Sequence, residues 1–454
     1  MKKLVTLLLA AGMVFSAANG ASAVEMKVSG SWLTSFTFAD NLFNSNRLLK
    51  DAKGDGSFNA AQRIRINFDM VASESLSGRV QLQVANGDAG PAYYSWGTSD
   101  TGGTGKTVTA RLAYLDWMVP TTDVLVRMGR QEVTTPSYTF GSPVLDTSVD
   151  GVLVNAPIND MVGVTLGWLR PHDLGDRWGL AHTAHSSIDL AYLAVDVAAD
   201  GFKVTPWGMV GLKGNATEGF DMVGVGTDTD PRTTVYWVGL GGELTMFDPF
   251  KFTADFMYSG NDAEGAAERK GWYAALGMEM KTSFATPFLR GWYASGDDAD
   301  SKDSNRFMSV DEGGAFDASS IYFDANGLLA ASIDRCNPAG TWGVQAGVKN
   351  VSFVEDLTHA LSVTYFQGTN NTQRVVDGYL PAVGTLTKPV GPAGYMTTSD
   401  SAWSIDFLSS YKLYQNLTAN LLLAYLVTDF DEKVWGDQKF DNAFRGTLNF
   451  TYAF

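Results

Sequence analysis

The stretch AQRIRINFDM, residues 61–70, combines two arginines and an aspartate with isoleucine, phenylalanine and methionine. Its even positions carry Gln62, Ile64, Ile66, Phe68 and Met70, whereas its odd positions carry alanine, two arginines, asparagine and aspartate. Alternation with a period of two residues is typical of a β-strand with one apolar and one polar face. The stretch therefore predicts a strand that separates an apolar environment from water.

The same alternation recurs along the whole chain, for example at 26–38, 80–84, 250–258 and 444–454. The connections between such runs alternate in length. Short connections lie at 119–123, 156–160, 198–201, 247–250 and 413–416. Long connections, rich in glycine and small polar residues, lie roughly at 40–58, 87–106, 131–149, 170–187, 214–233, 260–270, 297–340, 368–400 and 429–440. Short periplasmic turns at one end and long external loops at the other are typical of a transmembrane antiparallel β-barrel, and this is the layout that we expect here.

The runs predict an all-β barrel of about 18 strands, or 16 if the weak strands near 150–156 and 233–246 are misread. A soluble β-sandwich or propeller is the rival fold, but its buried face would carry leucine, isoleucine and valine. Here one face is aromatic and leucine-rich, and the other carries glycines and charges at mid-strand. An arginine at mid-depth against lipid costs ~2–4 kcal/mol, so Arg63 and Arg65 are expected to face a wet lumen. A spanning sheet leaves no open edge, so the strand at 26–38 should pair with that at 443–454.

The N-terminus has the layout of a secretory signal peptide. Lys2 and Lys3 precede an apolar run, and Ala21-Ser22-Ala23 forms a small-residue cleavage site. We therefore expect a signal peptide at 1–23 and one barrel domain at 24–454. An uncleaved anchor is disfavoured because the apolar run is too short to span a bilayer. The net charge of −16 argues against a nucleic-acid partner, and the single cysteine, Cys336, excludes an intrachain disulfide.

Four segments carry a resemblance to a known family. They are ARLAYLDW (110–117), VLVRMGRQ (124–131), SVDGVLVNAPI (148–158) and LRGWYASGDD (289–298). With them the chain resembles a Gram-negative general porin, and most of all the outer-membrane homotrimeric porins of sulfate-reducing, Desulfovibrio-type bacteria. The resemblance departs at the third loop, EVTTPSYTFGSPVLDTSV (132–149), which lacks the Pro-Glu-Phe-Gly-Gly motif of enterobacterial porins.

The resemblance implies a third loop folded into the lumen, a homotrimer, and contact with outer-membrane lipids and lipopolysaccharide. The aromatic C-terminus, Phe450, Tyr452 and Phe454, resembles the signal that outer-membrane proteins present to the barrel-assembly machinery. A ring of charges in a narrow wet passage sets a field and a size limit without any reaction. The candidate pore-lining residues are Arg63, Arg65, Arg79, Arg111, Arg127 and Arg130 on the wall, and Glu132, Asp146 and Asp150 on or near the third loop. An alternative is that some of these arginines only pair with Asp69 or other carboxylates of the wall.

No motif in the chain predicts catalysis, a metal or a cofactor. The loop TGGTGKT (101–107) has Asp100 where a phosphate loop needs glycine, and it leads into an alternating strand rather than a helix. The expected function is passive diffusion of small hydrophilic solutes and ions across the outer membrane. Two alternatives stay open: an anion- or substrate-selective channel, which the arginine cluster favours, and a non-conducting structural or adhesive surface barrel.

Overall fold

The computed structural model describes residues 24–42, 56–85, 94–97, 107–173, 187–214, 232–262, 268–299, 303–310, 316–323, 337–376, 395–437 and 439–454. The signal peptide expected at 1–23 lies outside these residues. The strands are β1 Glu25–Asp40, β2 Ser57–Ser73, β3 Leu76–Ala85, β4 Tyr94–Ser95, β5 Thr107–Met118, β6 Leu125–Thr134, β7 Asp146–Pro157, β8 Val162–Asp173, β9 Ser187–Ala199, β10 Phe202–Gly214, β11 Arg232–Phe247, β12 Phe250–Asp262, β13 Lys270–Met280, β14 Thr286–Ala294, β15 Thr341–Val354, β16 Leu357–Gly368, β17 Ser401–Tyr414, β18 Leu417–Asp429 and β19 Ala443–Ala453.

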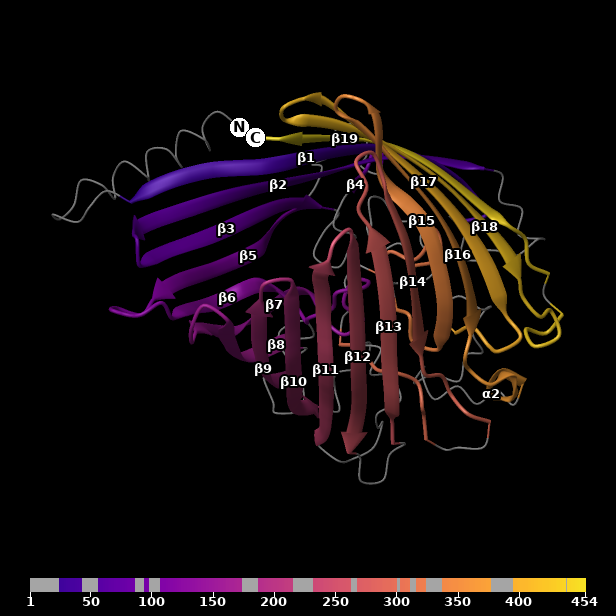
Figure 1. Ribbon diagram of the computed structural model, residues 1–454, viewed down its shortest axis with the longest axis horizontal. Coiled ribbons are helices and arrows are strands. Elements are labelled where there is room, and N and C mark those ends of the chain that lie inside the picture. The colour runs from indigo at the N-terminus through magenta and orange to yellow at the C-terminus, as the bar shows by residue number, and fades with distance from the viewer. Residues whose placement is uncertain are drawn as a thin grey trace.

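The strands form a closed antiparallel barrel of 18 wall strands. Ser31–Asp40 of β1 pair with Ala453–Phe444 of β19, and Figure 1 shows the two strands side by side. The two-residue β4 pairs with Ala61 and Gln62 of β2 and is additional to the wall. The predicted closure is confirmed, and so is the count of 18, because the runs that looked weak in the sequence are the full strands β7 and β11.

The predicted division into an apolar outer face and a polar inner face is also confirmed. On β1, Ser35 and Thr37 are fully buried in the interior, whereas Trp32 and Phe38 are about half exposed on the outside. Arg65 of β2 lies opposite a serine of β1 and a glutamine of β3. Its sequence neighbour Ile64 points to the other face, where it lies opposite a tryptophan of β1 and a valine of β3. A sheet with this pattern can close because its backbone groups pair around the ring and leave no edge.

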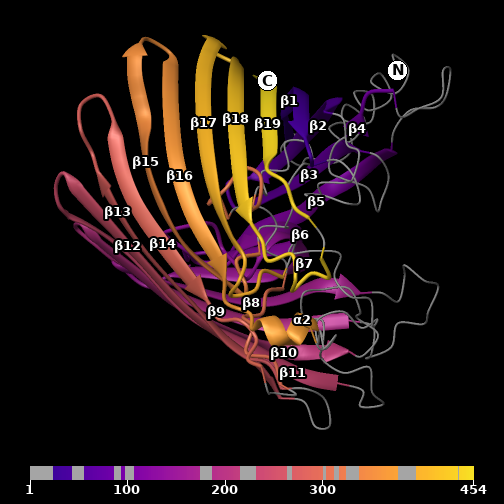
Figure 2. The ribbon, with the colours of Figure 1, turned by 90° about the vertical axis from the view of Figure 1, so that its right-hand side faces the viewer.

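The two ends of the barrel differ as the connection lengths predict. Figure 2 shows the tight turns of β15–β16 and β17–β18 at one end and the helix α2, Thr372–Val376, at the other. In the described part of the chain, no helix is long and apolar enough to cross a membrane. At the short-turn end the chain terminus is fixed by pairing, because Gly30 and Phe454 exchange two backbone hydrogen bonds of 2.7 and 3.1 Å.

Among the connections that the structure describes, two enter the barrel rather than one. Residues 135–145 between β6 and β7 form the expected third loop, which contacts the inner face of β12. We define the second inserted segment as residues 303–310 and 316–323, which belong to the connection between β14 and β15. Its Met308 carbonyl accepts a hydrogen bond from Trp237 of β11, and its Ser319 hydroxyl donates one to Ser404 of β17. The sequence predicts a long external loop here, so the insertion of this connection into the barrel is a correction.

Candidate pore and constriction

Five arginines gather on the inner face of neighbouring strands β2, β3, β5 and β6. We call Arg63, Arg65, Arg79, Arg111 and Arg127 the basic wall. The strands bring them together because β2 pairs with β3, β3 with β5, and β5 with β6. Arg111 reaches the inner face through an irregularity in β5, where the register shifts between the pairs of Gln81 and Leu82. A bulge of this kind redirects a side chain without breaking the sheet.

Two members of the basic wall are neutralised by aspartates of adjacent strands. Arg79 makes a two-pronged hydrogen-bonded pair with Asp69, with N–O distances of 2.6 and 3.0 Å. Arg127 holds Asp116 in the same way at 2.7 and 2.8 Å, and its guanidinium lies 4.2 Å from the ring centre of Tyr114. Paired groups of this geometry are rigid and carry little net charge. For these two arginines the alternative of pairing within the wall is therefore realised.

The remaining three arginines differ in their charge balance. Arg111 donates to the amide oxygen of Gln81 at 2.9 Å and forms an ion pair with Glu132. Arg65 donates to Gln83 at 2.8 Å, which is a neutral acceptor. Among the described residues, no carboxylate lies within ion-pair distance of Arg63 or Arg65. Within the part of the chain that the structure describes, the inner wall at β2 thus carries two positive charges without a carboxylate in direct contact.

The structure does not bring every candidate into this group. Arg130 pairs with Asp150 at 3.1 Å, and the β6–β7 register puts both on the face opposite to Arg127. Asp146 accepts a hydrogen bond of 2.6 Å from Thr134 at the entrance to the third loop. Glu132 alone of the three loop carboxylates contacts the basic wall.

The third loop is clamped to the opposite wall by Asp255 of β12. The backbone N–H groups of Tyr138 and Thr139 each donate to the Asp255 carboxylate at 2.8 Å, and Arg290 of β14 donates to the Thr139 carbonyl at 3.0 Å. The Tyr138 hydroxyl lies 2.7 Å from that of Thr205. The wall has no side chain at this contact because Gly241 lies there, and a Cβ at that position would come within 2.8 Å of the Tyr138 ring.

The second inserted segment packs against the third loop inside the barrel. The N–H of Val310 donates to the carbonyl of Val144 at 2.8 Å. Phe316 stacks on Phe140 of the third loop with a centroid distance of 4.8 Å, and Trp292 of β14 meets both rings edge-on. These rings form one buried apolar core within the lumen. Sequence reasoning missed it, although the aromatic residues in an otherwise polar connection were a usable signal.

At the long-connection end, buried carboxylates hold the outer segments together. Asp297 accepts a hydrogen bond of 2.8 Å from the hydroxyl of Tyr395. Asp400 accepts hydrogen bonds from Thr397 at 2.6 Å and from the indole of Trp435 at 3.1 Å. Burial raises the pKa of the Asp400 carboxyl despite these donors, and burial likewise raises the pKa of Tyr395. These contacts hold together the outer segments that adjoin the second inserted segment.

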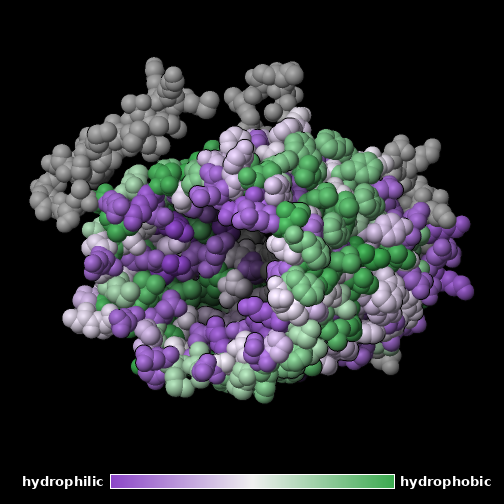
Figure 3. Space-filling view, turned by 45° about the horizontal axis from the view of Figure 1, so that its top comes forward, coloured by the Kyte–Doolittle hydropathy of each residue, from purple (hydrophilic) through white to green (hydrophobic). Residues whose placement is uncertain are grey.

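The barrel remains hollow beside these insertions. Figure 3 shows a central depression rimmed by hydrophilic residues, next to a broad apolar outer surface. The insertions contact the inner face from β10 to β19, for example at Thr205, Asp255 and Arg445, whereas the basic wall lies on β2, β3, β5 and β6. A polar passage with fixed charges on one side and clamped loops on the other restricts solutes by size and charge.

No protein-family model and no curated protein matches this sequence. Solved structures of Pseudomonas aeruginosa outer-membrane porins are similar in fold. OpdQ aligns over 94% of this chain and 97% of its own, with a TM-score of 0.55 and 11% identity. OprD aligns over 97% of both chains, with a TM-score of 0.54 and 12% identity. OccD3 (OpdP) aligns over 96% of this chain and 93% of its own, also with a TM-score of 0.54 and 12% identity. At such low identity the likeness shows a shared barrel fold.

Proposed function

We propose that this protein is an outer-membrane porin, a passive diffusion channel for small hydrophilic solutes and ions. The observation that carries the proposal is the closed barrel with an apolar exterior and a charged, hollow interior. Water in the lumen hydrates the arginines, and lipid covers the outside, so both faces are satisfied only in a membrane. The proposal includes export through a cleaved signal peptide and assigns no reaction, metal or cofactor to the chain.

Anion preference is the second candidate, and the basic wall favours it. Arg63 and Arg65 lack a direct carboxylate partner among the described residues, while the other three arginines have one each. The unbalanced charge lies beside the passage, where it acts on ions more strongly than the distant acidic loops do. The charge of the whole chain, −16, therefore does not set the preference.

The proposed partners follow from the motif resemblance. They are two further copies in a homotrimer, outer-membrane lipids with lipopolysaccharide, and the barrel-assembly machinery. A relation to the homotrimeric porins of sulfate-reducing, Desulfovibrio-type bacteria belongs to the same proposal. Native mass spectrometry of the protein extracted in mild detergent should give three times the mass of one mature chain. A single-chain mass under those conditions would remove the trimer from the proposal.

Single-channel recording in planar bilayers tests the channel itself. We expect stepwise conductance and, under a KCl gradient, a reversal potential of the sign given by anion preference. A barrel that inserts, as judged by protection from protease in liposomes, but never conducts would favour the structural or adhesive alternative. Comparable permeability to both ions would retain the porin and remove the anion preference.

A further inference from the structure

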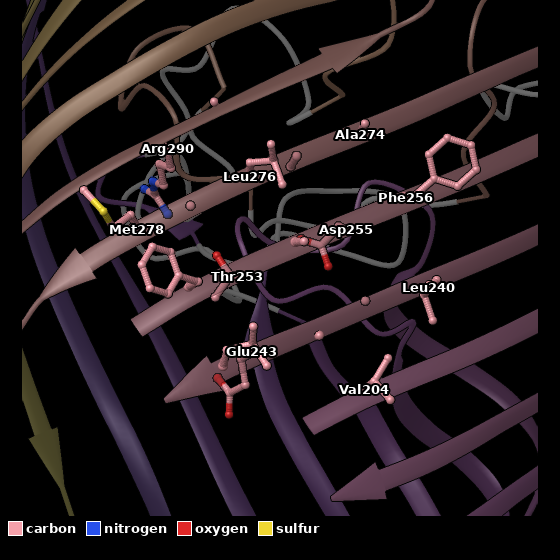
Figure 4. Close-up of a pocket in the computed structure, with 18 of the residues that line it drawn as sticks. Val204, Leu240, Glu243, Thr253, Asp255, Phe256, Ala274, Leu276, Met278 and Arg290 are labelled. Carbon is pink, nitrogen blue, oxygen red and sulfur yellow. The ribbon is translucent and has the colours of Figure 1, made fainter. Parts of the chain in front are cut away.

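A groove crosses the outer face of the barrel from β10 to β15, and it is separate from the pore. Its floor is made of small residues: Gly242, Ala254, Ala274 and Gly291. The strand register brings them close together. Gly242 lies opposite Ala254, and Leu276 of β13 lies opposite both Ala254 and Gly291. The groove encloses about 920 Å³, and Figure 4 shows its lining across successive strands.

The exposure of its lining residues places the groove on the outside. Phe256 is 50% exposed and Leu276 is 68% exposed, whereas Asp255 and Ala275, their neighbours in sequence, are buried against the inserted loop. Figure 4 shows the small side chain of Ala274 between the larger Leu276 and Phe256. Phe252 and Phe256 flank Ala254 along β12, so the floor is lower than its two sides.

Small residues between large ones suit a linear apolar occupant. In hydrocarbon, association gains nothing from leaving water, and it depends instead on close packing of surfaces. Glycine and alanine allow that close approach. The surrounding outer wall exposes large apolar side chains such as Val238, Leu240 and Leu289, and the groove surface itself is almost free of polar atoms. An acyl chain matches this chemistry.

The position of the groove indicates the leaflet and the headgroup. Ala254 lies four residues from Phe250 at the short-turn end, a distance of about 13 Å along the strand. At that end Lys281 is exposed in the turn after β13, and its N–H donates to the carbonyl of Pro249 at 2.8 Å. Asp248 precedes this proline and is the other exposed charge of the two turns. A lysine at the interface attracts an anionic headgroup.

We propose that the groove binds an acyl chain of an anionic phospholipid of the inner leaflet, with the lipid phosphate next to Lys281. The proposal rests on the membrane location proposed above. It names a lipid rather than a second copy of the chain, because a cation beside an apolar groove complements a phospholipid, and the groove surface is almost free of the polar atoms that would orient a protein partner.

The test is native mass spectrometry of the purified barrel with added phosphatidylglycerol or phosphatidylethanolamine. We expect a retained phosphatidylglycerol adduct on the unaltered protein. Ala254→Leu with Ala274→Leu fills the groove from side chains that already point outward, and should abolish the adduct. Lys281→Glu should reduce the ratio of phosphatidylglycerol to phosphatidylethanolamine retained toward one. Ala419→Leu, an outward alanine of β18 on another sector, is the matched control and should retain the adduct.

Three results would overturn the inference. They are no adduct on the unaltered protein, an undiminished adduct on the filled-groove variant, or a change in the number of copies when the groove is filled. The last would identify the groove as a subunit contact. Conductance of the same samples separates this proposal from the porin function. A variant that conducts normally but loses the lipid supports both, whereas a non-conducting barrel that retains the lipid contradicts only the channel.

Discussion

Arg63 and Arg65 differ from the neighbouring arginine Arg79 in whether a carboxylate pairs with them. Both lie on the wet face of β2, but neither meets a carboxylate among the described residues, while Arg79 on the next strand is held by Asp69. Identical side chains therefore have different electrostatic roles, and the difference depends on which residue lies opposite in the register. The parity of the sequence predicted the shared face. It did not predict the pairing, because a cross-strand partner depends on register.

Replacing Arg63 and Arg65 with glutamate should reverse the ion preference of the channel. The double variant changes the charge beside the passage from positive to negative, where counter-ions are concentrated. We expect the reversal potential in a KCl gradient to change sign toward cation preference. Lys433→Glu, an exposed site in the outer connection before β19, makes the same kind of charge change away from the wall and should leave the potential unaltered. An unchanged potential in the double variant would remove both arginines from the filter.

Asp255 is the single residue on which the position of the third loop most depends. Asp255→Ala removes the acceptor of two backbone N–H groups, each hydrogen bond to a charged acceptor being worth ~1.5–3 kcal/mol. We expect a noisier channel with more frequent conductance substates, because the loop is released while the wall persists. Asp255→Asn retains one carbonyl acceptor and should give an intermediate effect. Identical current noise in all three proteins would show that the clamp does not hold the loop.

At the scale of elements, the wall was predictable and its filling was not. Strands such as β2 and β12 can be recognised in the sequence, because lipid on one face and water on the other require apolar and polar side chains at alternate positions. The second inserted segment obeys no such period. Its place depends on contacts between distant parts of the chain, such as Phe316 with Phe140 and Ser319 with Ser404. Arg130 lies on the other face of β6 from Arg127, because three positions separate the two residues along the strand.

Phe316→Ala should loosen both inserted elements together. Phe316 is fully buried and packs on Phe140, Trp292 and Phe323 within 5.2 Å between ring centres. Truncating a buried phenylalanine costs ~3–5 kcal/mol. The cost falls on the lumenal core and not on the strand ladder, so protease accessibility of the third loop in the intact barrel should rise while the strand content by circular dichroism stays constant. Phe353→Ala, at a side chain that is 79% exposed, should change neither.

At the scale of the whole molecule, stability depends on closure, since no disulfide is available to the chain. The last strand must pair with the first, and Phe454 ends the chain at that seam with two backbone hydrogen bonds to Gly30. Its ring stacks on Tyr452 at 5.7 Å, on the outer face. A terminal aromatic pair thus lies where the final pairing step takes place, which accommodates the proposed role in barrel assembly.

Deleting Phe454 should reduce the amount of assembled barrel far more than the stability of barrels that do form. The side chain is 45% exposed, so little packing is lost from the folded state, whereas the proposed recognition signal loses its terminal residue. Folded and unfolded barrel, separated by heat-dependent mobility in detergent gels of membrane fractions, should shift toward the unfolded form. Phe250→Ala, a similarly exposed ring at a strand end away from the seam, should assemble normally. If both variants lost folded barrel equally, the ring would act through general interfacial packing and not through recognition of the C-terminus.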